Sequence, residues 1–286
     1  MQSTNQTIQI IECPRDAMQG WPHFIATADK IRYINTLLKV GFDTIDFGSF
    51  VSPKAIPQMA DTKEVLKALD LNNIISKLLA IVANKRGAED AVAFDEIKYL
   101  GFPFSISQTF QLRNTNSTME QSAMLVDEIQ ELCIKNNKTL VIYLSMGFGN
   151  PYGDPYSEEI LLQWADTMAQ KQIKIISLAD TVGVAQPEQI TTALTTLIPA
   201  YTNTVFGVHL HASPHNWKEK LLAAVNAGCT RIDGALKGIG GCPMAQDELV
   251  GNMDTLNILS TLEKQNNNIN SAALFEATNI ASEIFI

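Results

Sequence analysis

Eight short apolar runs, each rich in Ile, Val, Leu and aromatic residues, are separated along the chain by segments with a helical period. Their composition is typical of strands that are buried on both faces. The runs lie at 7–14, 44–50, 77–84, 96–107, 139–149, 173–183, 204–213 and 231–241. The pattern therefore predicts a regular alternation of strands and helices.

The segments between the runs carry the start and stop signals of helices. We expect four helices to begin at residues that cap or preset a first turn, namely Thr27, the Thr118–Gln121 pair, Pro187 and Asn216. Gly41 and Gly228 stand where helices are expected to stop. These signals support helices in the segments that follow the strands.

A strand followed by a helix, repeated eight times, is typical of a (β/α)₈ TIM barrel. The alternative is an open doubly wound sheet, but no Gly-rich GxGxxG motif follows the first strand. We expect one α/β domain over residues 1–286, with a barrel core at about 7–264. An extra C-terminal helical segment is predicted at about 268–286.

Composition narrows the classes of function. The chain has 286 residues, 46% of them hydrophobic, and a formal net charge of −9 without a basic cluster. A nucleic-acid partner is not expected, because such proteins usually present a basic face. No secretory leader and no apolar run of about 20 residues is present, so we expect a cytoplasmic protein without a membrane partner. The four cysteines lack paired spacing and are expected to be free thiols.

In a TIM barrel, function lies at the carboxyl ends of the strands and in the loops that follow. Several polar residues stand at these places, so we expect them to meet at one mouth. They are Arg15, Asp16, Asp46, Lys54, Asp180, His209, His211, Cys242 and Asn252.

His209 and His211 are two residues apart at the end of a strand, so their side chains share a face. Apolar Val208 and Leu210 take the other face, which points the imidazoles into the barrel. With Asp16 and Asn252 nearby, the pair predicts a metal site of nitrogen and oxygen ligands. Mg²⁺ or Mn²⁺ is expected first, and Zn²⁺ or Fe²⁺ also suits such ligands. Two hydrogen-bonded histidines without a special role are the alternative.

Three further residues have candidate roles in catalysis. Arg15 can direct a fixed cation at a carbonyl or enolate oxygen, or it can form a surface salt bridge. Asp180 can orient that arginine, act as a base, or cap the loop after its strand. Cys242 lies in the glycine-rich stretch "GIGGCP", where a thiol with a pKa near 8.5 can donate a proton. Its alternative is a buried hydrophobe, the role expected of the other three cysteines.

The stretches "ECPRDAMQ", "SFVSPKAIPQM", "ISLADTVGV", "VHLH" and "GIGGCPMAQ" resemble the motifs of the hydroxymethylglutaryl-coenzyme A lyase family. The resemblance covers almost the whole chain, in the right order. It implies a metal-dependent retro-Claisen cleavage of 3-hydroxy-3-methylglutaryl-CoA, or a related 3-hydroxyacyl-CoA, to acetyl-CoA and acetoacetate. Leucine degradation is the pathway that comes with this resemblance, and a homodimer is left open.

The resemblance also implies a role for each matching residue. Asp16, His209, His211 and Asn252 would hold the divalent cation. Arg15 would stabilise the enolate, Cys242 would protonate it, and Asp180 would lie close to the reacting groups. The hydroxyl proton would go to Asp16 or, as second choice, to His209. Gln19 and Lys54 are expected to contact coenzyme A by their position alone.

The sequence departs from the family pattern at some of these places. Asp46 stands where the family usually has a glutamate, and "RDA" replaces the usual "RDG". Two alternatives therefore remain open. One is an acetyl-CoA-dependent Claisen synthase of the isopropylmalate, citramalate or homocitrate type, and the other is a metal-binding barrel without catalysis.

Overall fold

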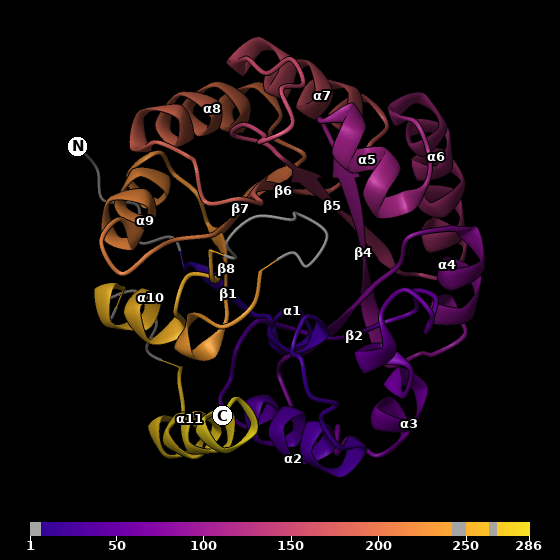
Figure 1. Cartoon of the computed structure of the whole chain (residues 1–286), viewed down its shortest axis with the longest axis vertical. Coiled ribbons are helices and arrows are strands. Elements are labelled where there is room, and N and C mark those ends of the chain that lie inside the picture. Colours follow the sequence, from indigo (N-terminus) through magenta and orange to yellow (C-terminus); the bar gives the residue numbers. More distant parts are fainter. Residues whose placement is uncertain (1–6, 242–249, 263–267) are drawn as a thin grey trace.

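The computed structural model describes residues 7–241, 250–262 and 268–286. Within these residues, eight parallel strands close into a barrel in sequence order (Figure 1). The prediction of a TIM barrel is confirmed. The strands are β1 (Gln9–Glu12), β2 (Thr44–Ser49), β3 (Lys77–Ile81), β4 (Ile97–Ser105), β5 (Thr139–Ser145), β6 (Ile175–Asp180), β7 (Val205–Leu210) and β8 (Arg231–Gly234).

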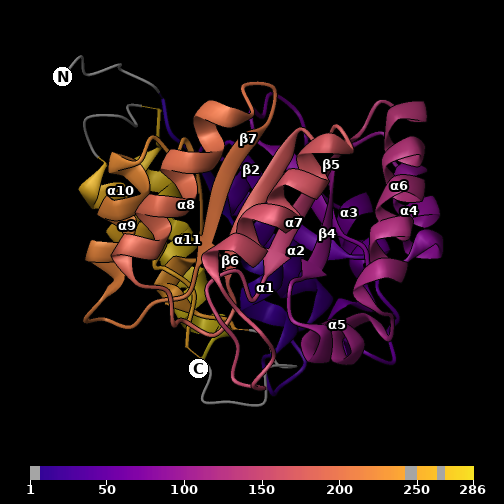
Figure 2. The ribbon, with the colours of Figure 1, turned by 90° about the horizontal axis from the view of Figure 1, so that it is seen from above.

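Helices surround the strands, and the views along and across the barrel agree on this arrangement (Figure 1, Figure 2). The α-helices are α1 (Pro14–Gln19), α2 (Thr27–Leu38), α3 (Thr62–Lys67), α4 (Lys85–Val92), α5 (Gln108–Thr115), α6 (Met119–Lys135), α7 (Glu158–Gln170), α8 (Pro187–Ala200), α9 (Trp217–Asn226), α10 (Thr255–Thr261) and α11 (Ser271–Ile284). Short 3₁₀ helices lie at η1 (Pro57–Met59) and η2 (Leu236–Gly238). None of these described helices has the length and hydropathy that crossing a membrane requires.

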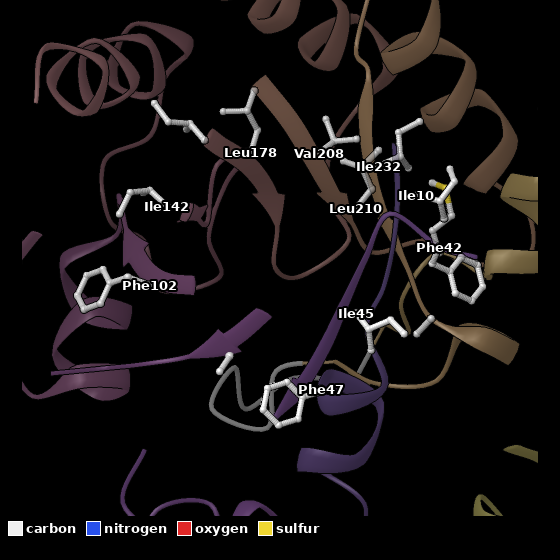
Figure 3. Close-up of a cluster of buried hydrophobic side chains, with 14 of the residues drawn as sticks. Ile10, Phe42, Ile45, Phe47, Phe102, Ile142, Leu178, Val208, Leu210 and Ile232 are labelled. Atoms are coloured by element: carbon white, nitrogen blue, oxygen red, sulfur yellow. The ribbon is translucent and has the colours of Figure 1, made fainter. Parts of the chain in front are cut away.

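Side-chain alternation along the strands separates two apolar clusters. The larger cluster lies between strands and helices, and Leu178, Val208 and Leu210 belong to it (Figure 3). A smaller cluster contains Val141 and Tyr143, which have the opposite parity on β5 to Ile142 of the larger cluster. Because successive side chains of a strand point to opposite faces, parity decides which residues face the barrel interior.

The four helices begin at or next to the expected residues, but the expected cap or first-turn feature is present at only two of the four places. Thr118 and Gln121 form a reciprocal capping box, and Pro187 is the first residue of α8. Thr27 is a helical residue rather than a cap, because Ala26 is the N-cap and the Thr27 hydroxyl donates to Asp61. Asn216 is the N-cap of α9 by position, but its side chain accepts from Ser213 and makes no cap bond to the helix.

The predicted C-terminal helical segment is present as α11, which packs against α2. Phe285, just after α11, meets the rings of Trp21 and Tyr33 at centroid distances of 5.2 and 6.2 Å. The N–H of Asn270 donates to the carbonyl of Val40, which joins the start of α11 to the end of α2. This extra helix therefore extends the outer helical layer beside α2.

Glu12, the last residue of β1, connects the two strands at which the barrel closes. One oxygen of its carboxyl group accepts the N–H of Leu236 at 2.9 Å, and the other oxygen forms a hydrogen bond of 2.5 Å with the hydroxyl of Thr255. Both partners follow β8 in sequence, so the bonds hold the segment after β8 beside the end of β1. The side chain is fully buried, and this burial raises the pKa of Glu12 from 4.5 to about 8.

We expect the contribution of Glu12 to the stability of the protein to fall as pH rises from about 4.5 to about 8. Over this range the folded chain keeps the Glu12 carboxyl protonated and the unfolded chain ionises it, so the folded state binds more protons. Glu12→Gln removes the titrating group, while its amide oxygen can accept from the N–H of Leu236 and its amide N–H can donate to the Thr255 hydroxyl oxygen. The measurement is the free energy of unfolding in urea at pH 5 and at pH 8. Between these two values it should decrease more in the wild type than in the variant, by roughly 2–4 kcal/mol.

Glu64→Gln, at an exposed position, is the matched control. Its free energy of unfolding should decrease between pH 5 and pH 8 by as much as that of the wild type. An equal decrease in the wild type and in Glu12→Gln would contradict this account of the buried carboxyl.

Candidate active site at the carboxyl ends of the strands

Arg15 and Asp16, expected at the end of the first strand or in the loop after it, lie on the short helix α1. The strand β1 ends at Glu12, and Pro14 opens the helix in the first-turn position that suits its fixed φ. In Figure 1, α1 lies nearer the barrel axis than α2 does. A six-residue helix thus carries both side chains to the mouth of the barrel.

Arg15 is held by two carboxylates. Its Nε and Nη2 donate to Asp46 Oδ2 at 2.9 and 2.5 Å, and its Nη1 donates to Asp16 Oδ1 at 3.0 Å. Burial opposes the charge on Arg15, but Asp46 and Asp16 outweigh this effect and raise the pKa of the guanidinium. Burial raises the pKa of Asp46 to about 6, although Arg15 acts in the opposite direction. Arg15 is therefore a fixed cation at neutral pH.

Asp16 accepts hydrogen bonds on both carboxylate oxygens. Oδ1 accepts from Gln19 Nε2 at 2.8 Å in addition to Arg15, and Oδ2 accepts from Asn252 Nδ2 at 2.7 Å. Burial alone would raise the pKa of Asp16, but Arg15, His209 and further polar groups lower it to about 2. The carboxylate is ionised over the whole physiological range of pH.

The two imidazoles face each other. His209 belongs to β7 and His211 follows that strand, and their Nε2 atoms are 3.3 Å apart. Both residues line the same cavity as Asp16. Asp16, His209 and His211 each offer a ligand atom within 4.8 Å of the other two. The structure therefore brings together three of the four residues expected to hold a metal.

Asn252, the fourth residue, reaches the same place through the backbone. It forms an antiparallel bridge with His211, and the N–H of Ala212 donates to the carbonyl of Gly251 at 3.0 Å. Gly240 lies so close that a Cβ on it would be 2.3 Å from Asn252 Nδ2, so no larger residue fits there without displacing the amide. The contact with Asp16 places the Asn252 side chain next to the group of Asp16, His209 and His211.

Two buried charged residues, Asp233 and Arg231, lie behind His209, and the sequence pattern was not used to predict them. His209 Nδ1 is 3.2 Å from Asp233 Oδ2, and Arg231 Nη1 donates to Asp233 Oδ1 at 2.8 Å. Burial would lower the pKa of His209, but the hydrogen bond and charge of Asp233 raise it. A signal existed: Arg231 and Asp233 are charged residues two apart in a short apolar run, which puts both on one face.

These donors fit a divalent cation. With Nδ1 of His209 directed at Asp233, its Nε2 is left with a lone pair toward Asp16 and His211. Burial, with the neighbouring His209, lowers the pKa of His211 to about 4, so His211 is neutral, as a metal ligand must be. Mixed imidazole and carboxylate ligands suit Mg²⁺, Mn²⁺, Fe²⁺ or Zn²⁺.

Cys13, His209 and Asp233 form a second group of possible ligands within 4.8 Å. Burial raises the pKa of the Cys13 thiol well above its usual value, and the nearby carboxylates add to this effect. A thiol that stays protonated is a poor metal ligand. Cys13, Cys133 and Cys229 are all free and buried, as the sequence predicts. The group of Asp16, His209 and His211 therefore fits a divalent cation better than the group of Cys13, His209 and Asp233 does.

Asp180 faces away from Arg15, so of the three roles considered for it, orienting that arginine is contradicted. In the β6–β7 register Ala179 pairs with His209, whereas Asp180 pairs with Leu210 of the outer apolar cluster. Asp180 therefore faces the helices, where it accepts from Lys220 Nζ at 2.6 Å. Its other oxygen accepts the N–H groups of Val184 and Ala185 at 2.8 and 3.1 Å. These contacts match the alternative expectation, in which Asp180 caps the loop after its strand.

A cavity of about 430 Å³ opens beside the candidate metal ligands Asp16, His209 and His211. Gln19 and Arg15 line it together with Asp16, His209 and His211. Lys54 is exposed and is not among the lining residues, although its neighbours Ser52 and Ala55 are. Cys242, the expected proton donor, lies outside the described residues.

The arrangement suits chemistry on an oxygen-rich substrate. A fixed cation on Arg15, an ionised Asp16 and two imidazoles face one cavity. Such a site can bind a hydroxyl or carbonyl oxygen and stabilise negative charge that develops on a neighbouring oxygen. The cavity is large enough for the acyl part of a thioester, within the range of small-molecule sites.

Comparisons with known proteins point the same way. Residues 7–282 match the HMGL-like family. The hydroxymethylglutaryl-CoA lyase YngG of Bacillus subtilis is 33% identical over 251 residues, which are 88% of this chain and 83% of that protein. The mitochondrial hydroxymethylglutaryl-CoA lyase of Homo sapiens is 30% identical over 275 residues, covering 95% and 84% of the two chains.

Two solved structures are similar over nearly their whole length. An HMG-CoA lyase from Acinetobacter baumannii, in complex with coenzyme A and 3-methylmalate, has a TM-score of 0.90 and 30% identity, covering 100% of this chain and 93% of that one. The HMG-CoA lyase of Bacillus subtilis also has a TM-score of 0.90, with 31% identity and 98% and 94% coverage. Since the family match spans nearly all of the chain that forms the barrel and its site, the chain belongs to the HMGL-like family.

Proposed function

We propose that the protein is a metal-dependent carbon–carbon lyase acting on 3-hydroxyacyl-CoA thioesters. One observation carries the proposal: Asp16, His209 and His211 place their ligand atoms within 4.8 Å of one another beside the cation of Arg15. A scaffold that only binds a metal has no need for a buried arginine in the same cavity. That cation supports catalysis over mere binding.

The proposed reaction is a retro-Claisen cleavage. The tertiary hydroxyl of the substrate loses its proton, the adjacent C–C bond breaks, and its electron pair passes to the thioester as an enolate. A proton then adds to the enolate carbon. With 3-hydroxy-3-methylglutaryl-CoA the products are acetoacetate and acetyl-CoA. A bound divalent cation would lower the pKa of the hydroxyl and hold it near Asp16.

Arg15 is positioned to carry the developing negative charge. Its Nε and Nη2 are held by Asp46, so the guanidinium does not have to reorganise during the reaction. Removing one such preorganised donor typically lowers kcat about 100- to 1000-fold in enzymes of acyl transfer. Gln19 lines the same cavity, and we keep it as a contact of the thioester.

Two residues are candidates for accepting the hydroxyl proton. Asp16 has its pKa lowered to about 2, which makes its carboxylate a weak base. His209 has a raised pKa and a carboxylate, Asp233, that stabilises its imidazolium form. Its Nε2, however, is also the nitrogen directed at the metal-binding group. Asp180, which faces away from the cavity, is not proposed as a base, and Cys242 is proposed as the acid that protonates the enolate.

The choice of substrate rests on the relatives. Two curated relatives carry the name hydroxymethylglutaryl-CoA lyase, and the similar structure from Acinetobacter baumannii binds coenzyme A. We extend this thioester class to the present chain, with the exposed Lys54 kept as a candidate contact for the coenzyme. Leucine degradation, a cytoplasmic location and a homodimer complete the proposal.

We expect the purified protein with Mg²⁺ or Mn²⁺ to release acetoacetate from 3-hydroxy-3-methylglutaryl-CoA under reducing conditions. The measurement is acetoacetate formation with and without added EDTA, which should abolish it. Turnover of acetyl-CoA and a 2-oxo acid, without cleavage of the thioester, would instead identify a Claisen synthase. Tight metal binding with neither reaction would identify a non-catalytic barrel.

Cys242→Ser should lower turnover at least about 100-fold, because a serine hydroxyl is a far weaker acid than a thiol. Metal affinity should stay within about twofold of the wild type, since a hydroxyl is not needed in the ligand set. Cys133→Ser, at a buried position of the helix layer, serves as the control for replacing a cysteine. Unchanged turnover in Cys242→Ser would remove the thiol from the mechanism.

A further inference from the structure

Lys220 is a lysine almost completely hidden in the protein interior. It lies on α9, outside the barrel, and is 1% exposed. Its Nζ donates three hydrogen bonds: to Asp180 Oδ2 at 2.6 Å, to the carbonyl of Gly183 at 2.9 Å and to the carbonyl of His211 at 2.9 Å. All three donor positions of the ammonium group are therefore used, two of them on the backbone.

These three partners come from different parts of the mouth. Asp180 ends β6, and Gly183 lies in the loop that the Asp180 carboxylate also holds through Val184. His211 follows β7 and is one of the metal-binding side chains. Lys220 thus connects the ends of two neighbouring strands from the side opposite to the cavity.

The backbone of His211 is held from two sides. On one side it forms a bridge with Asn252. On the other, its carbonyl accepts the charged hydrogen bond from Lys220. The residue lies beyond the last residue of β7, Leu210, so the strand ladder itself does not determine its position. Without Lys220, one of the two constraints on this peptide is lost.

We propose that Lys220 is a positioning residue for the metal site, fixing the His211 peptide so that its imidazole faces Asp16 and His209. The inference rests on the proposed metal-dependent function and adds a residue from the helix layer to it. Groups that orient a metal ligand typically change metal affinity about 10- to 100-fold when removed. A lysine in this place acts through backbone geometry, and it never touches the substrate.

A purely structural role is the competing explanation, and the chain offers a matched control for it. Lys30 on α2 is also 1% exposed, and its Nζ donates to Asp61 Oδ1 at 2.8 Å and to the carbonyl of Gln58. Lys30 has the same burial and the same kind of partners, but it has no recorded bond to Asp16, His209 or His211. Replacing either lysine with methionine leaves a buried carboxylate without its cation, which is destabilising.

The experiment measures the dissociation constant of Mn²⁺ by the EPR signal of the free aqua ion, together with the melting temperature. Lys220→Met should bind Mn²⁺ at least about 10-fold more weakly than the wild type. Lys30→Met should melt earlier but keep its Mn²⁺ affinity within about twofold. In the double variant Asp180→Asn/Lys220→Met, the unpaired charge is removed, so the melting temperature should recover while the weak affinity remains.

Three outcomes would overturn the inference. Wild-type affinity in Lys220→Met leaves the lysine a structural role only, whether or not the protein cleaves thioesters. Recovered affinity in the double variant assigns the effect to the unpaired Asp180 charge. Absence of Mn²⁺ binding in the wild type overturns the inference and the proposed metal site together. Mn²⁺ binding without thioester cleavage refutes the proposed function alone, and the ratio between the two lysine variants then still decides the role of Lys220.

Discussion

The two-residue alternation of side chains along β6 and β7 is the constraint on which the site depends. It turns His209 and Ala179 toward the barrel interior, and it turns Asp180 and Leu210 toward the helices. A shift of either strand by one residue would exchange the two sets. The inward direction of His209, the apolar layer outside the barrel and the contact between Asp180 and Lys220 all follow from this single register.

The register of the strands does not supply the carboxylate that faces the imidazoles. Asp16 supplies it, and this is the second requirement of the candidate metal site. Its helix starts at Pro14, directly after β1, so the carboxylate approaches the histidines from a neighbouring sector of the mouth. Gln19, Arg15 and Asn252 occupy its oxygens. Each of these donors makes the ionised form more favourable, which compensates for the loss of water on burial. These side chains of the protein therefore fix the position of the Asp16 carboxylate.

A charged layer supports this group from both sides of the barrel wall. Inside, Asp233 orients His209 and is itself neutralised by Arg231. Outside, Lys220 joins the His211 carbonyl to Asp180. Burying these charges is unfavourable unless each has a partner, and each of these groups has one. Such pairs stabilise one geometry more than they stabilise the fold.

Much of this could be predicted from local sequence patterns. The alternation of strands and helices predicts the barrel, and the spacing of His209 and His211 predicts their shared face. The same parity rule puts Ala179 and Asp180 of "LAD" on opposite faces of the strand, but it does not say which of them faces the barrel interior. The missing step was the register between β6 and β7, which no single strand reveals.

The remaining contacts depend on residues far apart in the chain. In the sequence, Lys220 looks like an ordinary exposed charge on an amphipathic helix. Its role becomes visible only with the contacts that α9 makes to the ends of β6 and β7. Asp233 reads as the polar end of a short strand until its register with His209 appears. Glu12 is similar, since its partner Thr255 is more than two hundred residues away. Local periodicity carries no information on such pairs.

The central claim is that Asp16, His209 and His211 hold one divalent ion, and pulsed EPR of bound Mn²⁺ tests it most directly. Electron spin echo modulation detects nitrogen nuclei that coordinate the ion. The account predicts coupling to two imidazole nitrogens in the wild type and to one in His211→Ala, with weaker binding in the variant. A bound Mn²⁺ ion without imidazole coupling, or with the same coupling in both proteins, would contradict it.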